Sequence, residues 1–489
     1  MEKTKNVLLV YPGVYGHPVP ELPLSIIYLG GALRNAGFNP ILHDMRIQQF
    51  QDISSIDFLA VGISAMTGNQ IINGLKIISR IKQRQPKVPI IWGGVHASIL
   101  PDNTLASPMA DIVVRGEGEI TLVELVNRLY KGEPLDGVLG LSFKKDNVVI
   151  NNPDRPYMNV DELPIDLPYE LLPLEKYPYY KNMAAFPLQS GRGCPHYCTF
   201  CYNVYFNKRM TRLKSSARVL EEIQYLIKKF KIKKLDISAA DDNFFVNKKR
   251  TEEIIDGLLK LDPPLKWTAF CRFDYFAKYE QSFVNSIAKS GCQLVSFGGE
   301  SGSEKILEAI KKDIKLEDMY ITSEKMSKTN MLQITSFMTG FPGETEEDFK
   351  STTDVIDKIS QINPNTHING IFVYTPYPGT PLYDMAVEKY GYTPPQTLEE
   401  WGNLRIYDDA GSPWISPKRK KLLSVLSILT RMPFNVEKYD LPDLGNPIYN
   451  FLYRILARDA RLRWKHRFFA FPLEWWILKK FLKFKRGYI

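Results

Sequence analysis

The sequence has 489 residues, of which 44% are hydrophobic and 24% are charged. This length exceeds what one hydrophobic core holds and predicts two or three domains, while the absence of any run of about 18 apolar residues excludes an integral membrane protein. The net charge is +9, but the segment 448–489 alone carries eleven Lys or Arg against Asp459 and Glu474, so the rest of the chain is close to neutral. The charge is therefore one local basic element, and nucleic acid is not an expected partner.

The first residues, MEKTKNVLLVYPG, contain a short apolar run that stops at Pro12 and Gly13 without a small-residue cleavage site. This pattern is typical of a first β-strand rather than a signal peptide and predicts a cytoplasmic protein. The five cysteines are an odd number, and three of them are clustered. They do not form a disulfide framework, and a reducing compartment leaves them free to bind a metal.

Residues 1–150 alternate short β-branched runs with amphipathic stretches. The runs are NVLLVYP, DFLAVGISA, VPIIWGG and DIVVRG, and the stretches between and after them include PLSIIYLGGALRNAG, NGLKIISRIKQRQ and EITLVELVNRLYKG. Alternation of strand and helix patterns predicts an α/β domain with a doubly wound parallel sheet. Ligands of such sheets bind beyond the carboxyl ends of the strands, where the sequence has the loops SAMTGN, GGVHAS and VRGEGE.

The next segments predict a hairpin in LGLSFKKDNVVINNPDRP, a Pro-rich linker over 151–185 and a second alternating series over 186–390. This series has six strand patterns, namely FPLQSG, IKKLDISAADDNF, LKWTAFCRFD, CQLVSFGGE, QITSFMTGFPGE and INGIFVYTPYPGT. Six units are too few for a closed eight-fold barrel but fit an open, partial (β/α)6 barrel. Residues 391–489 lack strand patterns and predict a helical C-terminal region.

The stretch GRGCPHYCTFCYN places Cys194, Cys198 and Cys201 within eight residues, directly after the first strand of the second series. Three cysteines leave a structural zinc site one ligand short, and His196 lies too close to them in sequence to be an easy fourth ligand. A four-iron cluster held by three thiolates keeps one iron open for a small ligand. The alternatives at this point are structural zinc, an electron-transfer cluster completed by Cys271 or Cys292, and coincidence.

The spacing, the position after a strand and the aromatic Phe200 before the third cysteine make this loop similar to the cluster-binding loop of radical S-adenosylmethionine (SAM) enzymes. The resemblance covers most of the chain up to about residue 390. It implies a [4Fe-4S] cluster on the three cysteines, SAM bound at its open iron, reductive cleavage of SAM to methionine and a 5′-deoxyadenosyl radical, and a one-electron reductant such as flavodoxin or ferredoxin.

The same resemblance implies SAM contacts at later strand ends. Asp241, Asp242 and Asn243 follow the second strand, where the family usually binds the methionine amino group, and a carboxylate suits an ammonium. Arg272 follows the third strand and is a candidate partner of the methionine carboxylate. Glu300 and Ser301 stand where the ribose hydroxyls are usually held. Each has an alternative interpretation, such as a helix cap for 241–243 or a solvated carboxylate for Glu300.

The first domain resembles the Rossmann-like cobalamin-binding domain that precedes some radical SAM barrels. The residues that carry the resemblance lie in three loops and are Ser64, Met66, Thr67, Gly93, Gly94, His96, Arg115, Gly116 and Glu117. The D-x-H-x-x-G motif that many cobalamin domains use to place a histidine under the cobalt is absent, so the lower face is expected to meet the loop from Ser64 to Thr67, with His96 as a contact to the corrin or its nucleotide tail. The alternative is a degenerate domain that binds nothing.

The last 42 residues interleave twelve aromatic with eleven basic side chains. Short amphipathic helices of this composition predict contact with an anionic membrane interface. A lid packed across the open barrel by its aromatic residues is the alternative, and both interpretations stay open.

The leading hypothesis is a cobalamin-dependent radical SAM enzyme that modifies, by methylation, an unactivated carbon of a hydrophobic small molecule or lipid. The second is an oxidative cyclase that resembles the anaerobic magnesium-protoporphyrin ester cyclase. A non-catalytic iron-sulfur or corrinoid carrier is a third, which the set of SAM-contact segments disfavours.

Overall fold

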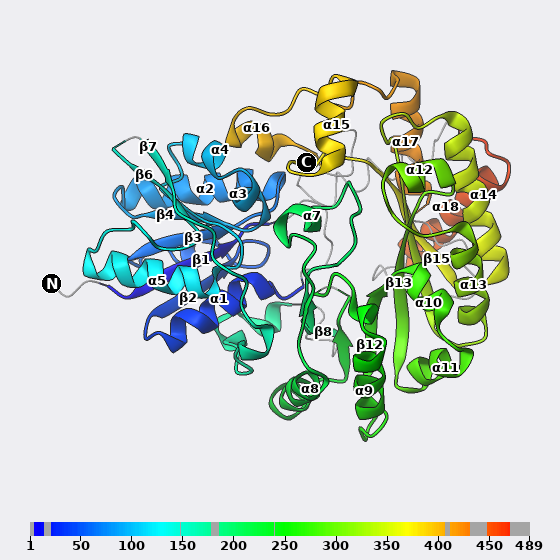
Figure 1. Ribbon diagram of the computed structural model, residues 1–489, viewed down its shortest axis with the longest axis horizontal. Helices are drawn as coiled ribbons and strands as arrows, with labels where there is room; N and C mark the ends of the chain where they lie inside the picture. The colour runs from blue at the N-terminus through cyan, green and yellow to red at the C-terminus, as the bar shows by residue number, and fades with distance from the viewer. Residues whose placement is uncertain are drawn as a thin grey trace. The chain divides into compact units, whose positions relative to one another are not determined.

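The structure is a computed structural model that describes residues 4–13, 21–146, 148–177, 185–238, 240–405, 411–430 and 447–469 (Figure 1). The chain divides into two compact units. The first unit consists of residues 1–267, 376–387 and 393–406, and the second unit of residues 268–375, 388–392 and 407–489. The predicted domain borders at residues 150, 185 and 390 remain predictions.

The N-terminal sheet has seven strands in the order β2-β1-β3-β4-β5-β6-β7. Strands β1 to β5 are parallel, and the hairpin β6–β7 extends the sheet antiparallel, as the sequence predicted. The strand β2 was not predicted. The strands are β1 (Asn6–Tyr11), β2 (Asn39–Asp44), β3 (Ala60–Ser64), β4 (Ile90–Gly93), β5 (Ile112–Val114), β6 (Leu141–Lys145) and β7 (Val148–Asn151).

Helices cover both faces of this sheet because its strands present apolar side chains alternately to each face. Leu8 and Val10 of β1 pack with Ile78 and Ile81 of α2, whereas α1 and α5 lie side by side on the other face (Figure 1). The helices are α1 (Leu24–Asn35), α2 (Asn69–Arg84), α3 (Val95–Ile99), α4 (Pro101–Ala106) and α5 (Gly118–Lys131), with a single 3-10 turn η1 (Phe50–Asp52). The prediction of a doubly wound α/β domain is confirmed.

The segment after the hairpin is packed rather than extended, contrary to the predicted linker. It forms three 3-10 turns, η2 (Val160–Glu162), η3 (Tyr169–Leu171) and η4 (Leu174–Lys176). Several of its apolar side chains are almost fully buried, among them Leu163, Leu167 and Leu172. Val160 in η2 and Tyr169 in η3 are also buried, so the segment buries apolar surface along its length, which a flexible linker does not do.

The second large sheet has six strands in the order β15-β14-β13-β12-β11-β8, so neighbouring strands follow one another in the chain. The strands are β8 (Ala185–Pro187), β11 (Lys234–Asp236), β12 (Lys266–Cys271), β13 (Cys292–Glu300), β14 (Leu332–Thr339) and β15 (Thr366–Val373). Strands β8 and β11 pair in parallel, as do β13, β14 and β15. The six predicted strands are all present, and the sheet is the predicted open, partial barrel.

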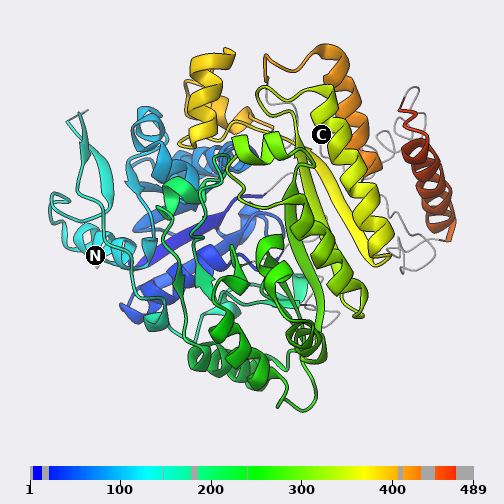
Figure 2. The ribbon, with the colours of Figure 1, turned by 45° about the vertical axis from the view of Figure 1, so that its right-hand side comes forward.

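Helices separate these strands where the sequence has caps and apolar residues at helical spacing. Helix α14 begins with a capping box between Thr345 and Asp348, and it lies with α17 beside β15 (Figure 2). The helices of this region are α8 (Ser216–Phe230), α9 (Lys248–Leu258), α10 (Phe273–Lys278), α11 (Gln281–Lys289), α12 (Glu304–Ala309), α13 (Leu316–Ser327) and α14 (Glu346–Ile362), with a 3-10 turn η5 (Phe244–Val246).

The C-terminal region is helical over the residues that the structure describes, as predicted. It contains α15 (Pro381–Tyr390), α16 (Leu398–Asn403), α17 (Pro417–Leu429) and α18 (Pro447–Lys465). Among the described helices, none is both long enough and apolar enough to cross a membrane. The basic, aromatic end of the tail, residues 470–489, lies outside the described residues.

Candidate functional site

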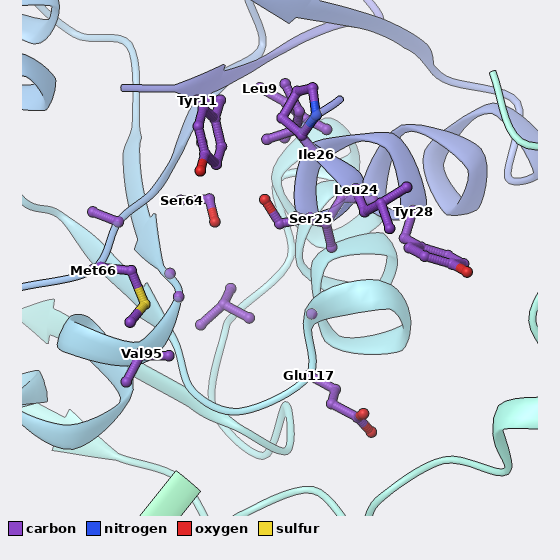
Figure 3. A pocket seen from close by; sticks show the side chains of 18 of the residues that line it. Leu9, Tyr11, Leu24, Ser25, Ile26, Tyr28, Ser64, Met66, Val95 and Glu117 are labelled. Carbon is purple, nitrogen blue, oxygen red and sulfur yellow. The ribbon is translucent and has the colours of Figure 1, made fainter. Parts of the chain in front are cut away.

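A cavity of about 470 Å³ lies in the first unit at the carboxyl ends of β1, β3, β4 and β5. In a doubly wound sheet of this strand order, the crevice between the first and third strands is where ligands bind. Figure 3 shows Tyr11, Ser64 and Met66 around this cavity, with Ser25 at the start of α1. The cavity therefore occupies the place where the sequence predicted a ligand, and its volume lies in the range of small-molecule sites.

Residues that flank the cysteine segment line the same cavity. Arg192 precedes Cys194 by two positions, and Tyr202 directly follows Cys201. Phe206 and Asn207, which end and follow the short helix α7 (Asn203–Phe206), also line it, as does Asp242. One cavity is thus shared by the loops of the N-terminal sheet and by the segment that carries the cysteines.

Gly94 brings two of the cavity loops into contact. It has a φ of +85°, which favours glycine, and a Cβ at this position would lie 2.7 Å from the carbonyl oxygen of Ala65 and 2.8 Å from its amide nitrogen. The amide of Ala65 donates to the Gly93 carbonyl at 3.0 Å, and the amide of His96 donates to the Ala65 carbonyl at 3.3 Å. The loops SAMTGN and GGVHAS are therefore held together by their backbones.

Six of the nine residues that the sequence predicted for cobalamin line the cavity, namely Ser64, Met66, Gly93, Gly94, Gly116 and Glu117. Three do not: Thr67, His96 and Arg115. The Thr67 hydroxyl and His96 Nδ1 lie 3.0 Å apart, and His96 is fully buried against the ring of Trp401. Burial lowers the pKa of His96 to about 3, so its ring is neutral. These two side chains therefore contact each other outside the cavity lining, and their predicted contacts to cobalamin remain predictions.

Arg115 contacts the hairpin, and its predicted contact to cobalamin remains a prediction. Its guanidinium donates to the Leu141 carbonyl at 2.8 Å, to the Ser142 hydroxyl and to the Asn152 carbonyl, and it forms an ion pair with Asp154 at 3.1 Å. None of the described residues that line the cavity is a histidine.

A small antiparallel ribbon brackets the cysteine segment. Its strands are β9 (Gly191–Arg192) and β10 (Arg212–Leu213), and all three clustered cysteines lie between them in the chain. Gly193 has a φ of +82°, and a Cβ there would lie 2.1 Å from the Met210 carbonyl oxygen, so only glycine fits. The Cys201 amide donates to the Cys198 carbonyl at 3.0 Å. These contacts fold the cysteine segment into a compact loop.

The thiols of this loop lie close enough to influence one another. The pKa of Cys201 is raised to about 12, mainly by burial; a backbone hydrogen bond at Asn203 acts in the opposite direction, and the charges of Cys198, Asp242 and Cys194 contribute to the rise. Among the described residues, no three potential ligands converge on a single ion. A cubic cluster needs no such convergence because each thiolate binds a different iron, and the positive charge of the irons favours thiolates over thiols.

The other two cysteines are occupied elsewhere. The Cys271 thiol donates to the Arg272 carbonyl at 3.2 Å, and the Cys292 thiol donates to the Leu294 carbonyl at 3.5 Å. Both are buried, and burial raises the pKa of each thiol. These two thiols have the character of inert core cysteines rather than of ligands.

The three predicted SAM contacts after β11 have different surroundings. Asp241 is buried and accepts hydrogen bonds from the backbone amides of Ser190 at 2.7 Å and Gly191 at 3.1 Å, and from the Ser190 hydroxyl. Asp242 accepts from the Gly193 amide at 2.9 Å and lines the cavity. Asp241 therefore anchors the start of the cysteine segment, and Asp242 is the carboxylate that faces the ligand space.

Asn243 and Phe200 complete the predicted set within the first unit. Asn243 is buried, and neither its amide nitrogen nor its amide oxygen has a hydrogen-bond partner among the described residues. A buried amide without partners is costly, so this side chain is a candidate for a bound ligand. Phe200 is half-buried in the cysteine loop.

Three further predicted SAM contacts lie in the second unit, and two of them meet at Lys312. The Arg272 guanidinium donates to the Asp274 carboxylate at 2.8 Å and to the Lys312 carbonyl at 2.5 Å. The Lys312 ammonium lies 2.6 Å from the Glu300 carboxylate. Glu300 has a φ of +61° at a bulge of β13, a conformation that costs a non-glycine residue about 1–3 kcal/mol and is often found at functional sites.

Ser301 has a structural role in the same unit. It is fully buried, its hydroxyl lies 3.2 Å from that of Thr352, and it accepts a hydrogen bond from the Ser303 amide at 3.1 Å. The turn after β13 therefore uses this hydroxyl for its own backbone, and the predicted contact of Ser301 to the ribose remains a prediction.

Comparison with known proteins agrees with this geometry. Residues 14–126 match the family of B12-binding domains, and residues 188–356 match the radical SAM superfamily. An uncharacterized methyltransferase of Pyrococcus horikoshii is 34% identical to this chain over 79% of this chain and 84% of its own length. The chain belongs to the radical SAM enzymes that carry a B12-binding domain. The cofactors of this cobalamin-binding radical SAM enzyme are a [4Fe-4S] cluster, SAM and cobalamin.

Other relatives differ in their named reactions but share the architecture. The anaerobic magnesium-protoporphyrin IX monomethyl ester cyclase of Synechocystis is 25% identical over 83% of this chain and 81% of its own length. Among solved structures, that of the cobalamin-dependent S-adenosylmethionine radical enzyme OxsB with aqua-cobalamin bound has a TM-score of 0.68 and 19% identity, covering 99% of this chain and 76% of that chain. This structural likeness confirms the predicted fold.

Sequence reasoning missed several cavity residues of this radical SAM enzyme. Tyr11 and Tyr28 come from β1 and α1, and Arg192 and Tyr202 flank the cysteines. Arg192 and Tyr202 could have been predicted, because they belong to the motif GRGCPHYCTFCYN that contains Cys194 and Cys201. Tyr28 had no such signal, since its place on the inner face of α1 is ordinary for an aromatic residue.

Proposed function

We propose that this radical SAM enzyme is a C-methyltransferase that acts on an unactivated carbon of a hydrophobic substrate. The observation that carries the proposal is the shared cavity, which is lined both by the loops of the B12-binding domain and by Tyr202, the residue after Cys201. A methyl donor and a hydrogen-abstracting centre must act on the same substrate carbon in one turnover, so their sites must face a common space.

The residues of the chain supply binding, orientation and the exclusion of water. When bound, the cluster with SAM supplies hydrogen-atom abstraction, and cobalamin supplies methyl transfer. Cys194, Cys198 and Cys201 would hold the cluster, and the loops at Ser64, Gly94 and Gly116 would hold the corrinoid. Apolar side chains around the cavity, including Leu9, Ile26, Ile91 and Leu122, keep it poor in water.

Asp242 is the best candidate for the ammonium of SAM. Its carboxylate faces the cavity, and its only described fixed donors are the Gly193 amide at 2.9 Å and the Tyr202 hydroxyl at 3.4 Å. A carboxylate with remaining acceptor capacity at the edge of the cysteine loop suits a charged amino group.

The names of relatives also support methyl transfer. Besides the Pyrococcus protein, a bacteriochlorophyllide d C-12(1)-methyltransferase of Chlorobaculum tepidum is 26% identical over 74% of this chain. The Synechocystis cyclase favours the alternative of ring formation without methyl transfer.

Anaerobic turnover tests the proposal. The protein is purified with cobalamin, its cluster is reconstituted, and dithionite and SAM are added while 5′-deoxyadenosine and S-adenosylhomocysteine are measured. A methyltransferase forms both products, and a cyclase forms 5′-deoxyadenosine alone. The variant Cys198→Ala should form neither, whereas the control Cys292→Ala, which changes a cysteine outside the loop, should form both. Absence of both products from wild-type protein with an intact cluster would contradict the proposal.

We also propose that α18 contacts an anionic membrane surface. Phe451, Ile455 and Leu462 are exposed by 62%, 47% and 59%, and the exposed Arg454 and Arg458 lie on the same helix. Apolar and cationic side chains on one helix surface suit a bilayer interface with anionic lipid. Sedimentation with vesicles of phosphatidylglycerol should decrease in an Arg454→Glu, Arg458→Glu variant, and equal sedimentation with neutral phosphatidylcholine vesicles would contradict the electrostatic part.

A further inference from the structure

Two arginines stand opposite each other in the ribbon that closes the cysteine segment. In the antiparallel pairing of β9 with β10, the partner of Arg192 is Arg212. Like charges directly opposite each other destabilise a pair of strands. The ribbon has only two residues in each strand, so it has little pairing energy of its own to offset this repulsion.

Glu117 lies between these arginines and bonds to both. Its Oε1 accepts from Nη1 of Arg192 at 2.8 Å, and its Oε2 accepts from Nη1 of Arg212 at 2.6 Å. Glu119 accepts from the other terminal nitrogen of Arg192 at 2.6 Å. The four side chains are only 10–14% exposed. Charges this buried are tolerated only when they are paired, and here two carboxylates balance two guanidinium groups.

The remaining donors of the arginines fix the cysteine segment itself. Nε of Arg192 donates to the Gln189 side chain at 2.8 Å, just before the ribbon. Nη2 of Arg212 donates to the side chain of Asn207 at 3.0 Å, and Asn207 follows the helix that begins two residues after Cys201. The carboxylate of Glu117 therefore holds both ends of the cysteine loop, one through Arg192 and the other through Arg212.

The same glutamate belongs to the loop that forms part of the corrinoid cavity. Gly116, Glu117, Gly118 and Glu119 all line it, as part of the turn from β5 into α5. Any occupant that orders this turn also orders the carboxylates on which the cysteine ribbon depends. In contrast, Arg212 does not line the cavity itself, and it contacts the cavity residues Glu117, through an ion pair, and Asn207, through a hydrogen bond.

We propose that Glu117 is a positioning residue that closes the cysteine loop and couples its geometry to the occupancy of the corrinoid cavity. This role differs from the cobalamin contact that the sequence predicted for it, because both carboxylate oxygens are used by arginines. The inference depends only on the two cofactor sites and holds whichever reaction the enzyme catalyses.

Coupling of this kind is reciprocal by thermodynamic necessity. If a formed cluster strengthens cobalamin binding by a given factor, bound cobalamin stabilises the formed cluster by the same factor. Allosteric coupling between sites typically changes affinity by about fivefold or more. We therefore expect the Kd for cobalamin to be at least about fivefold lower in cluster-loaded protein than in cluster-free protein.

The test uses the full-length protein and measures the ratio of the Kd for cobalamin in cluster-free protein to the Kd in cluster-loaded protein. Hydroxocobalamin is titrated anaerobically into cluster-loaded and cluster-free samples, and binding is followed by absorbance. Three variants are compared with wild type: Glu117→Gln, Arg212→Gln and the control Glu124→Gln. Glu124 lies on the same helix α5 and is also ion-paired, but its partners are Arg155 and Arg128, which lie outside the cysteine segment. The electron paramagnetic resonance (EPR) spectrum of the reduced cluster, with and without cobalamin, provides a second readout.

The proposal predicts that Glu117→Gln and Arg212→Gln bring the ratio close to 1 and remove the effect of cobalamin on the cluster spectrum, while Glu124→Gln keeps both. A direct cobalamin contact would instead raise the Kd of Glu117→Gln equally in both states and leave Arg212→Gln like wild type, which would overturn the proposal. A ratio of 1 in wild-type protein would also overturn it. Should Arg212→Gln fail to fold by circular dichroism, Arg212→Lys, which retains the charge but not the fork of donors, takes its place.

Discussion

Replacement of Asp241 by asparagine distinguishes two roles for this residue, an anchor of the cysteine loop and a ligand of SAM. The carboxylate accepts from two backbone amides and one hydroxyl, and burial raises its pKa to about 6, while the hydrogen bonds from Ser190 and Gly191 and the charge of Arg250 act in the opposite direction. An asparagine at this position keeps an oxygen acceptor for the two amides and turns its nitrogen to the Ser190 hydroxyl. The substitution therefore removes the buried charge and preserves the contacts.

The size of the expected change in the free energy of unfolding follows from the shift in the pKa of Asp241. In the unfolded chain the carboxyl group titrates near its ordinary value of 3.8, so between about pH 4 and pH 6 the folded protein binds more protons than the unfolded chain. The free energy of unfolding of wild type thus falls as the pH rises through this window, by about 3 kcal/mol in total for a shift of about two units. Asparagine does not titrate, so Asp241→Asn should be more stable by about 3 kcal/mol at pH 8 and by about 1.5 kcal/mol at pH 5.

Urea denaturation of protein without added cofactors, followed by tryptophan fluorescence between pH 5 and pH 8, measures this difference. Asp241→Ala is the matched control, because it leaves the two amides without an acceptor and should be less stable than Asp241→Asn by about 2–6 kcal/mol. A difference between Asp241→Asn and wild type that does not change with pH, or a wild type that is more stable at pH 8, would refute the reasoning.

Two further predictions concern a buried ion pair and the glycines of the cavity loops. Lys214→Met should lower the free energy of unfolding by at most about 3–5 kcal/mol, because Lys214 is 1% exposed and its loss leaves the buried Glu222, 2.7 Å away, with Arg218 at 3.1 Å as its remaining described ion-pair partner. The double variant with Glu222→Leu should recover most of this loss in urea denaturation, and a double variant as unstable as the single one would contradict the account. Gly94→Ala should abolish cobalamin binding in an absorbance titration, because its Cβ would meet the backbone of the neighbouring loop. Gly116→Ala should cost only about 1–2 kcal/mol, because its φ of +71° disfavours a side chain but nothing lies within 4 Å of its Cβ, and equal loss of binding in both variants would contradict this difference.

Much of the fold follows from sequence patterns, and the exceptions have physical reasons. The strands of both sheets are β-branched runs between helical stretches, and this pattern alone predicts them. The edge strand β2 was missed because NPILHD begins with Asn39 and Pro40 and ends in His43 and Asp44, residues that are unusual in strands. The packed segment after the hairpin was predicted to be a linker because its many prolines are typical of one, although Leu163 and its neighbours are buried.

The sequence predicted which loops form the site, but it did not predict which side chain of each loop faces the cavity. Asp241 and Asp242 are adjacent and chemically identical, and only the fold determines that Asp241 holds the cysteine segment while Asp242 faces the cavity. Pairing between distant residues is also beyond sequence patterns, since Glu117 and Arg192 lie 75 positions apart. His96 was predicted to face the ligand because its motif contains it, yet it packs under the loop against Trp401.

The central claim is that one cavity brings the corrinoid to the cysteine loop, and the spin interaction between the two cofactors tests it most directly. Protein loaded with cob(II)alamin and the reduced cluster is examined by EPR and compared with samples that contain each cofactor alone. Two paramagnetic centres that share a cavity should broaden or split each other's signals, so the spectrum of the doubly loaded protein should differ from the sum of the two single spectra. A spectrum equal to that sum would contradict the account.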